Sequence, residues 1–336
     1  MSDFFTHRFT DRRGFVRRTI AGVASLGALS LLAAEKSNSA NPFAYDVRRF
    51  LTTDPKLIAY QQKRVFRIPH DGAKGMAIDA NGHLLIAAGK FINELKPDGT
   101  DVSQITLADN VRCVAAAGDD IYIALRDHVE VYDRNGRRKA TWDSPGPKAY
   151  FTSLATGDND VFVADAGQRV VHRYDRSGKL VKRIGEKNRE RNIPGFIVPS
   201  PFFSIALAKD GLLRATNPGR HRVEVYTVDG DMEQTWGRAG AAIENFCGCC
   251  NPIHLTMLSD GRVVTLEKGI PRVKIYAADG AFESVVAGAE SFAENATLCG
   301  PSDCTVGGLA GAVDGQGRIY ILDLVAKNVR VMERKS

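Results

Sequence analysis

Apolar and polar positions alternate along this chain in a unit that recurs six times. A short apolar strand is followed by a polar turn, a second strand, a Gly turn and a third strand. The clearest copies span residues 161–185, 212–237 and 263–288, where the second strand ends in Tyr. Looser copies span 84–99, 121–142 and 319–332. Strand repeats of this period indicate a solenoid, a propeller or another array.

Each unit is also preceded by a further apolar segment, which raises the expected number of strands per unit to four. Residues 75–78, 113–116 and 254–257 are examples, and a turn such as Lys209-Asp-Gly211 follows each segment. These turn residues supply the positive φ that tight hairpins need. Because no convincing helical stretch separates the units, the sequence predicts an all-β fold, a six-bladed β-propeller with four antiparallel strands per blade.

The two ends of the repeat region indicate how the ring closes. The last unit stops after its third strand, at residues 329–333, while a surplus strand at 64–68 precedes the first unit. We therefore expect the N-terminal strand to complete the last blade and remove an exposed sheet edge. The alternative is that residues 64–68 are only a linker.

The N-terminal forty residues differ from the rest in pattern. Asp11-Arg-Arg-Gly-Phe-Val-Arg17 matches the twin-arginine export signal, and residues 19–34 form an apolar run too short to span a membrane. We expect a signal peptide at 1–40, an extension with a short helix (53–62) at 41–62, and the propeller at 63–336. Such a leader implies a bacterial protein in the periplasm or outside the cell. A retained leader is the alternative, and the only membrane contact expected.

The charge of the chain excludes one class of partner. The formal net charge is +6, and the first forty residues, with six basic and three acidic residues, supply half of it. This excess is too mild for a nucleic-acid-binding protein, so we expect a protein or a small anionic ligand. The turn between the second and third strands of every blade holds a basic residue, and we take Arg169, Arg220 and Lys268 as ligand-binding candidates. The alternative is local hydrogen bonding at charged surface turns.

Cysteines are the most distinctive candidate chemistry. Cys247, Cys249 and Cys250 lie between the fourth and fifth blades, and Cys299 and Cys304 lie between the fifth and sixth. Loops at these places open on one face near the channel. Three interpretations compete: disulfides, a metal or iron–sulfur site that could include His254, and redox-active thiols at the vicinal Cys249-Cys250. The spacing matches no standard zinc or ferredoxin pattern.

The turn motifs resemble those of the NHL-repeat family of six-bladed propellers. The matches are Asp165 with Arg169, Asn217 with Arg222, and Pro271-Arg272, followed in the last two by Asp-Gly turns at 229–230 and 279–280. The resemblance covers about residues 62–336 and implies architecture much more than activity. The family is similar in fold to peptidylglycine amidating lyases, which bind zinc through His, so His70, His254 and either His128 or His221 are further candidates.

Two functional hypotheses follow. The first is an exported binding module that uses its cysteine-rich face, as an accessory to a periplasmic redox system. The alternative is a metal- or iron–sulfur-dependent enzyme or electron-transfer protein with its site at the channel mouth, where Glu267 or Asp303 would be the nearest general base. Long loops before the last three blades carry apolar residues that could wall a pocket: Phe196, Ile197, Phe202, Phe203, Phe246 and Phe292. The alternative is that these residues only pack the loops down. The sequence names neither a substrate nor a reaction.

Overall fold

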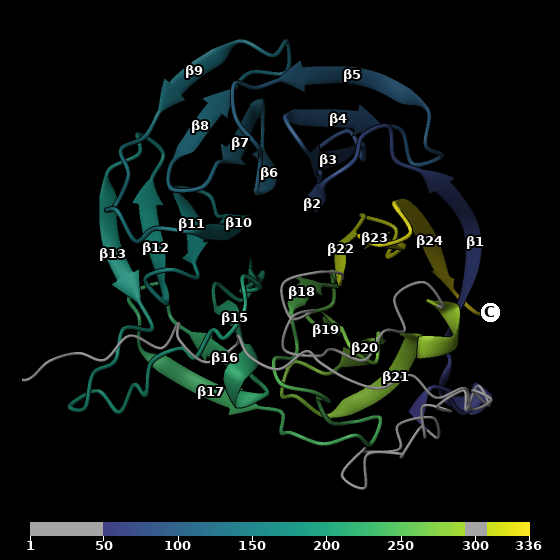
Figure 1. Ribbon diagram of the computed structural model, residues 1–336. Coiled ribbons are helices and arrows are strands. Elements are labelled where there is room, and N and C mark those ends of the chain that lie inside the picture. Colours follow the sequence, from purple (N-terminus) through teal and green to yellow (C-terminus); the bar gives the residue numbers. More distant parts are fainter. Residues whose placement is uncertain (1–49, 293–307) are drawn as a thin grey trace, which may run out of the picture. The chain divides into compact units, whose positions relative to one another are not determined.

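The computed structural model describes residues 50–292 and 308–336, and these residues form six four-stranded antiparallel sheets arranged in a ring (Figure 1). The innermost strands of the six blades are β2 (Ala73–Ile78), β6 (Cys113–Ala117), β10 (Phe151–Thr156), β14 (Ile205–Leu207), β18 (His254–Met257) and β22 (Leu309–Val313). Each inner strand contacts the inner strands of the two neighbouring blades, and β2 contacts β22. The all-β six-bladed propeller predicted from the repeats is therefore confirmed.

The second and third strands of the blades form most of the core. They are β3 (Leu84–Ala88) and β4 (Phe91–Leu95), β7 (Asp120–Ala124) and β8 (Val129–Tyr132), β11 (Asp160–Asp165) and β12 (Val170–Asp175), β15 (Leu213–Asn217) and β16 (Arg222–Tyr226), β19 (Val263–Leu266) and β20 (Val273–Tyr276), and β23 (Ile319–Asp323) and β24 (Asn328–Arg334). Strands such as β3 and β8 are buried at every position because neighbouring blades cover both faces of each sheet. This explains their nearly continuous apolar sequences.

The outer strands are mostly exposed. They are β5 (Asp101–Thr106), β9 (Arg138–Thr141), β13 (Leu180–Ile184), β17 (Met232–Trp236), β21 (Phe282–Ala287) and, for the last blade, β1 (Tyr60–Arg67). In β5 only one of six positions is buried. An outer strand lies beyond the reach of the neighbouring blades, so its composition can be polar.

The ring closes as the sequence predicted, but the N-terminal segment differs from the expectation. Strand β1 pairs antiparallel with β24, and Tyr60 lies opposite Arg334. The helix predicted over residues 53–62 is wrong: a single 3-10 turn (Pro55–Leu57) is followed by β1, which begins at Tyr60. Residues 61–64 are Gln, Gln, Lys and Arg, which are common in helices, but pairing with the free edge of β24 overrides that preference.

Two aromatic–glycine contacts lock consecutive blades together. Gly178, in the turn after β12, has φ +90° and lies against the ring of Trp142 from the preceding blade. Gly280 repeats the arrangement with φ +89° against Trp236. A side chain at either glycine would collide with the indole, and the positive φ also favours glycine. The Gly turns of the repeat thus serve packing between blades as well as the hairpins.

None of the helices in the described ranges is long and apolar enough to span a membrane. The predicted signal peptide at 1–40 and the predicted leader motif lie outside the described residues.

Candidate functional site

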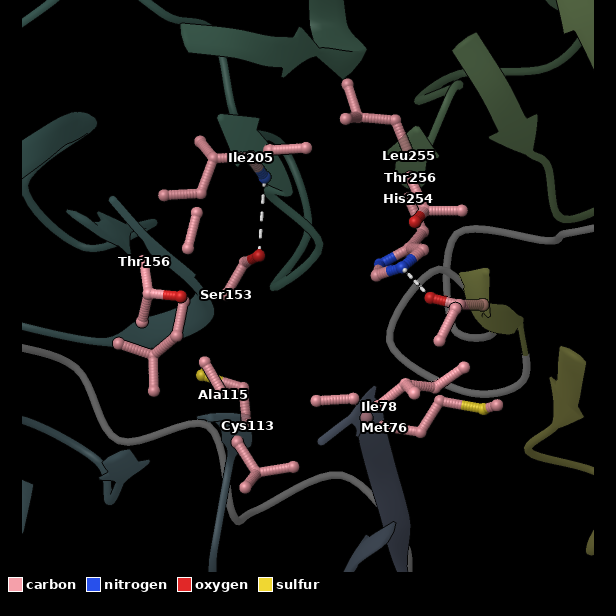
Figure 2. A pocket seen from close by; sticks show the side chains of 18 of the residues that line it. Met76, Ile78, Cys113, Ala115, Ser153, Thr156, Ile205, His254, Leu255 and Thr256 are labelled. Atoms are coloured by element: carbon pink, nitrogen blue, oxygen red, sulfur yellow. Dashed lines mark hydrogen bonds between the residues drawn. The ribbon is translucent and has the colours of Figure 1, made fainter. Parts of the chain in front are cut away.

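The inner strands surround two cavities that share lining residues. The mouth cavity, about 400 Å³, lies where the inner strands begin and is bounded by the loops that lead into them. The channel cavity, about 350 Å³, continues along the inner strands (Figure 2). Lys74, Thr152 and His254 line both cavities. The mouth therefore leads directly into the channel.

Two cations line the mouth cavity. Lys74 is the second residue of β2, and Arg112 directly precedes β6 in the next blade. A guanidinium nitrogen of Arg112 donates to the Tyr150 hydroxyl, and its Cζ lies 4.2 Å from the centroid of the Tyr150 ring. The Nε of Arg112 is buried and has no hydrogen-bond partner among residues 50–292 and 308–336. The tyrosine thus holds the guanidinium in place while one of its donors is left unused.

No acidic side chain of residues 50–292 or 308–336 balances this pair. The mouth-cavity lining contains no Asp or Glu, and neither Lys74 nor Arg112 forms an ion pair with the carboxylates in those ranges. Burial lowers the pKa of Lys74, and the positive charge of Arg112 lowers it further. Both effects disfavour the charged lysine, and a bound anion would reverse the second.

The opposite side of the mouth cavity is apolar. Phe202 and Phe203 reach it from the loop before β14, and Ile253, Leu309 and Leu324 complete the lining. The expectation that loop aromatics wall a pocket is met by Phe202, which is half-buried at the cavity, whereas the ring of Phe203 is buried against Phe196 in the core. The remaining loop residues differ: Phe196, Phe246 and Phe292 are buried in the core, while Ile197 is an exposed residue outside both cavities.

His254 lines both cavities and links three blades through its hydrogen bonds; Figure 2 shows its ring among the residues that line the channel cavity. Its Nε2 donates to the Gly311 carbonyl oxygen at 3.0 Å, so in the neutral ring Nδ1 accepts from the Ser204 hydroxyl at 3.1 Å. Burial lowers the pKa of His254 to about 4. Both ring nitrogens are occupied, and metal binding by His254 would have to displace one of these bonds.

The described cysteines occupy different environments. The Sγ atoms of Cys249 and Cys250 are 3.3 Å apart, longer than a disulfide bond, and the Ser200 hydroxyl donates to Cys250 Sγ at 3.4 Å. Cys113 lines the channel cavity, where burial raises the pKa of its thiol. Cys299 and Cys304 lie outside the described residues, as does Asp303. The predicted thiolate site with Cys247 therefore stays a prediction.

Within the described part of the chain, one group of three potential ligands has its ligand atoms within 4.8 Å of one another: Asp79, His83 and Glu94. It does not include the predicted cysteines or His254. Its atoms are already engaged, since Asp79 Oδ2 pairs with Arg134 at 2.6 Å and Glu94 Oε1 pairs with His83 Nδ1 at 2.7 Å. It lies at the far end of β2 from the mouth cavity, where it joins two blades.

Glu267 has a structural role in holding the cysteine-rich loop. Its carboxylate contacts Arg272 at 2.8 Å and Lys274 at 2.8 Å, and it accepts the Cys247 backbone N–H at 3.1 Å. All three charged side chains are buried. Arg272 and Lys274 also donate to carbonyl oxygens of residues 241–245, which fixes the loop before β18 to blade five. Such engagement leaves Glu267 little capacity to act as a general base.

The predicted cationic turn residues share the face of the mouth cavity but do not line it. Lys268 is buried, with its Nζ 4.3 Å from the centroid of the Phe202 ring. Arg169 adopts φ +60°, and Arg220 lies in the 3-10 turn Pro218–Arg220. Neither lines either cavity. Their predicted ligand-binding role stays a prediction.

The sequence analysis missed Lys74, Arg112 and Tyr150. A usable signal exists: each of the first two is the residue immediately before the apolar core of an inner-strand segment, at 75–78 and 113–116, in consecutive repeats. Aligning the six repeats at that position would have shown two cations followed by four uncharged residues. The contact between Arg112 and Tyr150 joins two neighbouring blades, and no local sequence pattern indicates it.

No protein-family model and no curated protein sequence matches the chain. Solved structures do. A streptogramin B lyase structure is 12% identical, with a TM-score of 0.54 over 82% of this chain and 98% of that one. Virginiamycin B lyase from Staphylococcus aureus is 12% identical, with a TM-score of 0.53 over 82% of this chain and all of that one. A catalytically inactive variant of that lyase with quinupristin is 12% identical, with a TM-score of 0.54 over 82% of this chain and all of that one. At this identity the likeness extends to the propeller fold alone.

Proposed function

We propose that this protein is a ligand-binding propeller that holds a small anion in the mouth cavity. The observation that carries the proposal is the pair of cations, Lys74 and Arg112, in a cavity whose described lining contains no carboxylate. Positive groups gathered in a concave, partly desolvated site attract negative ligands more strongly than the same groups on an open surface.

The cations divide the work of binding. Arg112 is oriented by Tyr150 and offers a planar set of donors, which suits a carboxylate or phosphate. Lys74 adds a point charge on a flexible stem. Because Arg112 contributes to the lowered pKa of Lys74, an anion placed between them relieves their repulsion and raises that pKa.

The cellular setting belongs to the same proposal. The twin-arginine-type leader supports export to the periplasm or beyond, and the turn motifs support membership of the NHL-repeat propellers. We propose that the cysteine-rich face around the mouth meets a protein partner there, in a redox system. Detecting the folded protein in the periplasmic fraction, and its loss after replacement of Arg12 and Arg13 by Lys, would support export.

A metal- or iron–sulfur-dependent activity is the second candidate, supported by the two neighbouring sulfur atoms of Cys249 and Cys250 on this face. Metal and acid-labile sulfide should be measured on protein exported through its own leader and purified without chelators. About one metal ion or cluster per chain, lost in Cys250→Ser, would favour this candidate. Metal-free protein whose cysteines become reactive only after reduction would eliminate it and indicate disulfides.

Anion binding can be tested by isothermal titration calorimetry with acetate, inorganic phosphate and phenylacetate. We expect at least one of these anions to bind, and Lys74→Met and Arg112→Met each to weaken binding about tenfold or more. Lys209→Met is the matched control, because Lys209 is an exposed lysine in the turn between β14 and β15, on the face of the propeller opposite the mouth cavity. Absence of binding by all three anions, or equal losses in the control, would overturn the proposal.

A further inference from the structure

The mouth cavity has two chemically different walls. The cationic wall consists of Lys74, Arg112 and Tyr150, which come from the first three blades. The apolar wall consists of Phe202, Phe203, Ile253, Leu309 and Leu324, which come from the last three blades. A ring built from one repeated unit does not require this asymmetry. The walls face each other across a cavity of about 400 Å³, a size that suits a small organic ligand.

The apolar wall offers surface that solvent can reach. Phe203, Ile253 and Leu309 are buried, whereas Phe202 and Leu324 are only half-buried at the edge of the cavity. The position of the Phe202 ring is supported by Lys268, whose Nζ lies 4.3 Å from the ring centroid and 3.4 Å from the Ser200 hydroxyl. A ring held in this way is available for stacking or apolar contact without losing much conformational freedom.

The channel below the mouth limits the shape of the ligand. Each inner strand is hydrogen-bonded to a neighbouring strand on one side only, so its other edge faces the channel with backbone polar groups. Thr152, Ser153, Thr156 and Thr256 add hydroxyls to the channel lining. An extended alkyl chain would have to cover these polar groups, which costs free energy. An apolar group that binds here would therefore have to be compact and to stay in the mouth.

We infer that the ligand of the mouth cavity is a compact aromatic carboxylate, with its anionic group on the cationic wall and its ring against Phe202. The inference rests on the proposed anion-binding function and narrows it to one chemical class. An inorganic anion would use only the cationic wall and leave the apolar wall in water. An aromatic amine would place a positive charge beside Lys74 and Arg112. A ligand with both features satisfies both walls, and the ring of Phe202 offers a face for stacking.

Calorimetric titration with matched probes tests the inference. The probes are phenylacetate, its neutral analogue phenylacetamide, phenethylamine, acetate, octanoate and inorganic phosphate. We expect phenylacetate to bind about tenfold or more tightly than acetate, phosphate, phenylacetamide and phenethylamine, because burial of the ring and pairing of the charge each contribute on the order of a tenfold factor. Octanoate should bind more weakly than phenylacetate.

Substitutions in the two walls separate the contribution of the ring from the contribution of the charge to binding. Phe202→Ser should reduce phenylacetate affinity to near that of acetate and leave acetate binding unchanged, while Phe202→Tyr should retain phenylacetate binding. Lys74→Met should weaken the binding of every carboxylate probe. Thermal unfolding of each variant checks that the fold is intact.

The contrary results are distinct. Equal affinity for acetate, phosphate and phenylacetate would overturn the aromatic class and leave anion binding standing. Tighter binding of octanoate would assign the ligand to alkyl carboxylates instead. Binding of phenethylamine as tight as that of phenylacetate would overturn the orientation of charge. No binding of any anion would overturn the proposed function itself.

Discussion

Two groups of positive side chains in this propeller differ in whether a carboxylate of the protein pairs with them. In blade five, Arg272 and Lys274 are buried around the carboxylate of Glu267 and the carbonyl oxygens of the cysteine-rich loop. At the mouth cavity, Lys74 and Arg112 lie near each other in a cavity whose described lining has no acidic residue. The first group finds a carboxylate and carbonyl acceptors within the chain. The second has no carboxylate partner among the described residues, and we propose that a ligand supplies one.

The difference distinguishes structural from functional charge. A buried cation that finds its counter-charge within the chain fixes a loop, because removing either partner strands a charge in the interior. A half-exposed pair without a counter-charge gains nothing for the fold, since the two cations repel each other. Such a pair is a candidate binding site because its cost is recovered when an anion binds.

The largest effect should come from the neutralised group. Glu267→Gln leaves Arg272 and Lys274 buried without a negative partner, and we expect the free energy of unfolding to fall by about 3–5 kcal/mol. Chemical denaturation measures it. Asp231→Asn, which removes an exposed pair with Arg191, is the matched control and should cost less than about 1 kcal/mol. Equal losses in the two variants would show that the buried group has no special role.

A second effect should appear as a pH dependence of stability. The pKa of His254 is lowered to about 4 in the folded protein, compared with about 6.5 when unfolded. Between these values the unfolded chain binds more protons than the native one, so stability falls as pH decreases from about 6.5 to about 4. The loss attributable to His254 can reach about 3 kcal/mol.

Urea denaturation at a series of pH values measures this dependence. His254→Gln should flatten it over that interval, because glutamine does not titrate. A wild-type curve that is already flat between pH 6.5 and 4 would contradict the assignment of a buried neutral His254.

The smallest effect on stability should come from the mouth pair. Lys74→Met removes an exposed cation and its repulsion with Arg112, so we expect a change within about 0.5 kcal/mol. Its effect should appear in binding instead. An anion raises the lowered pKa of Lys74, so binding should be strongest below that pKa, weaken as the pH rises through it, and take up protons there.

Calorimetry of carboxylate binding in buffers of different ionisation enthalpy detects that proton uptake. Lys74→Met should abolish it, and Lys209→Met should not. A large loss of stability in Lys74→Met would blur the distinction between the two groups of cations and assign the mouth lysine a structural role.

The sequence by itself determined the repeat and its consequences. Alternating strands with Gly and Asp turns fixed four strands in each of six blades, and the match between a surplus and a missing strand led to the β1–β24 pairing. These features are local or arise from counting repeats. The sequence misled where local preference conflicts with pairing, as at residues 60–62, which join β1 rather than a helix.

Only the tertiary structure decided which charged residues line a cavity and which are buried in contacts within the protein. Lys268 and Glu267 looked available in the sequence, yet both are buried, one beside Phe202 and the other between two cations. Lys74 and Arg112 looked like ordinary strand-end residues, yet they share a cavity with aromatic residues from distant blades. The physical reason is ring closure, which brings residues that are far apart in sequence together around the channel axis. No local sequence pattern determines which of these residues lie opposite one another.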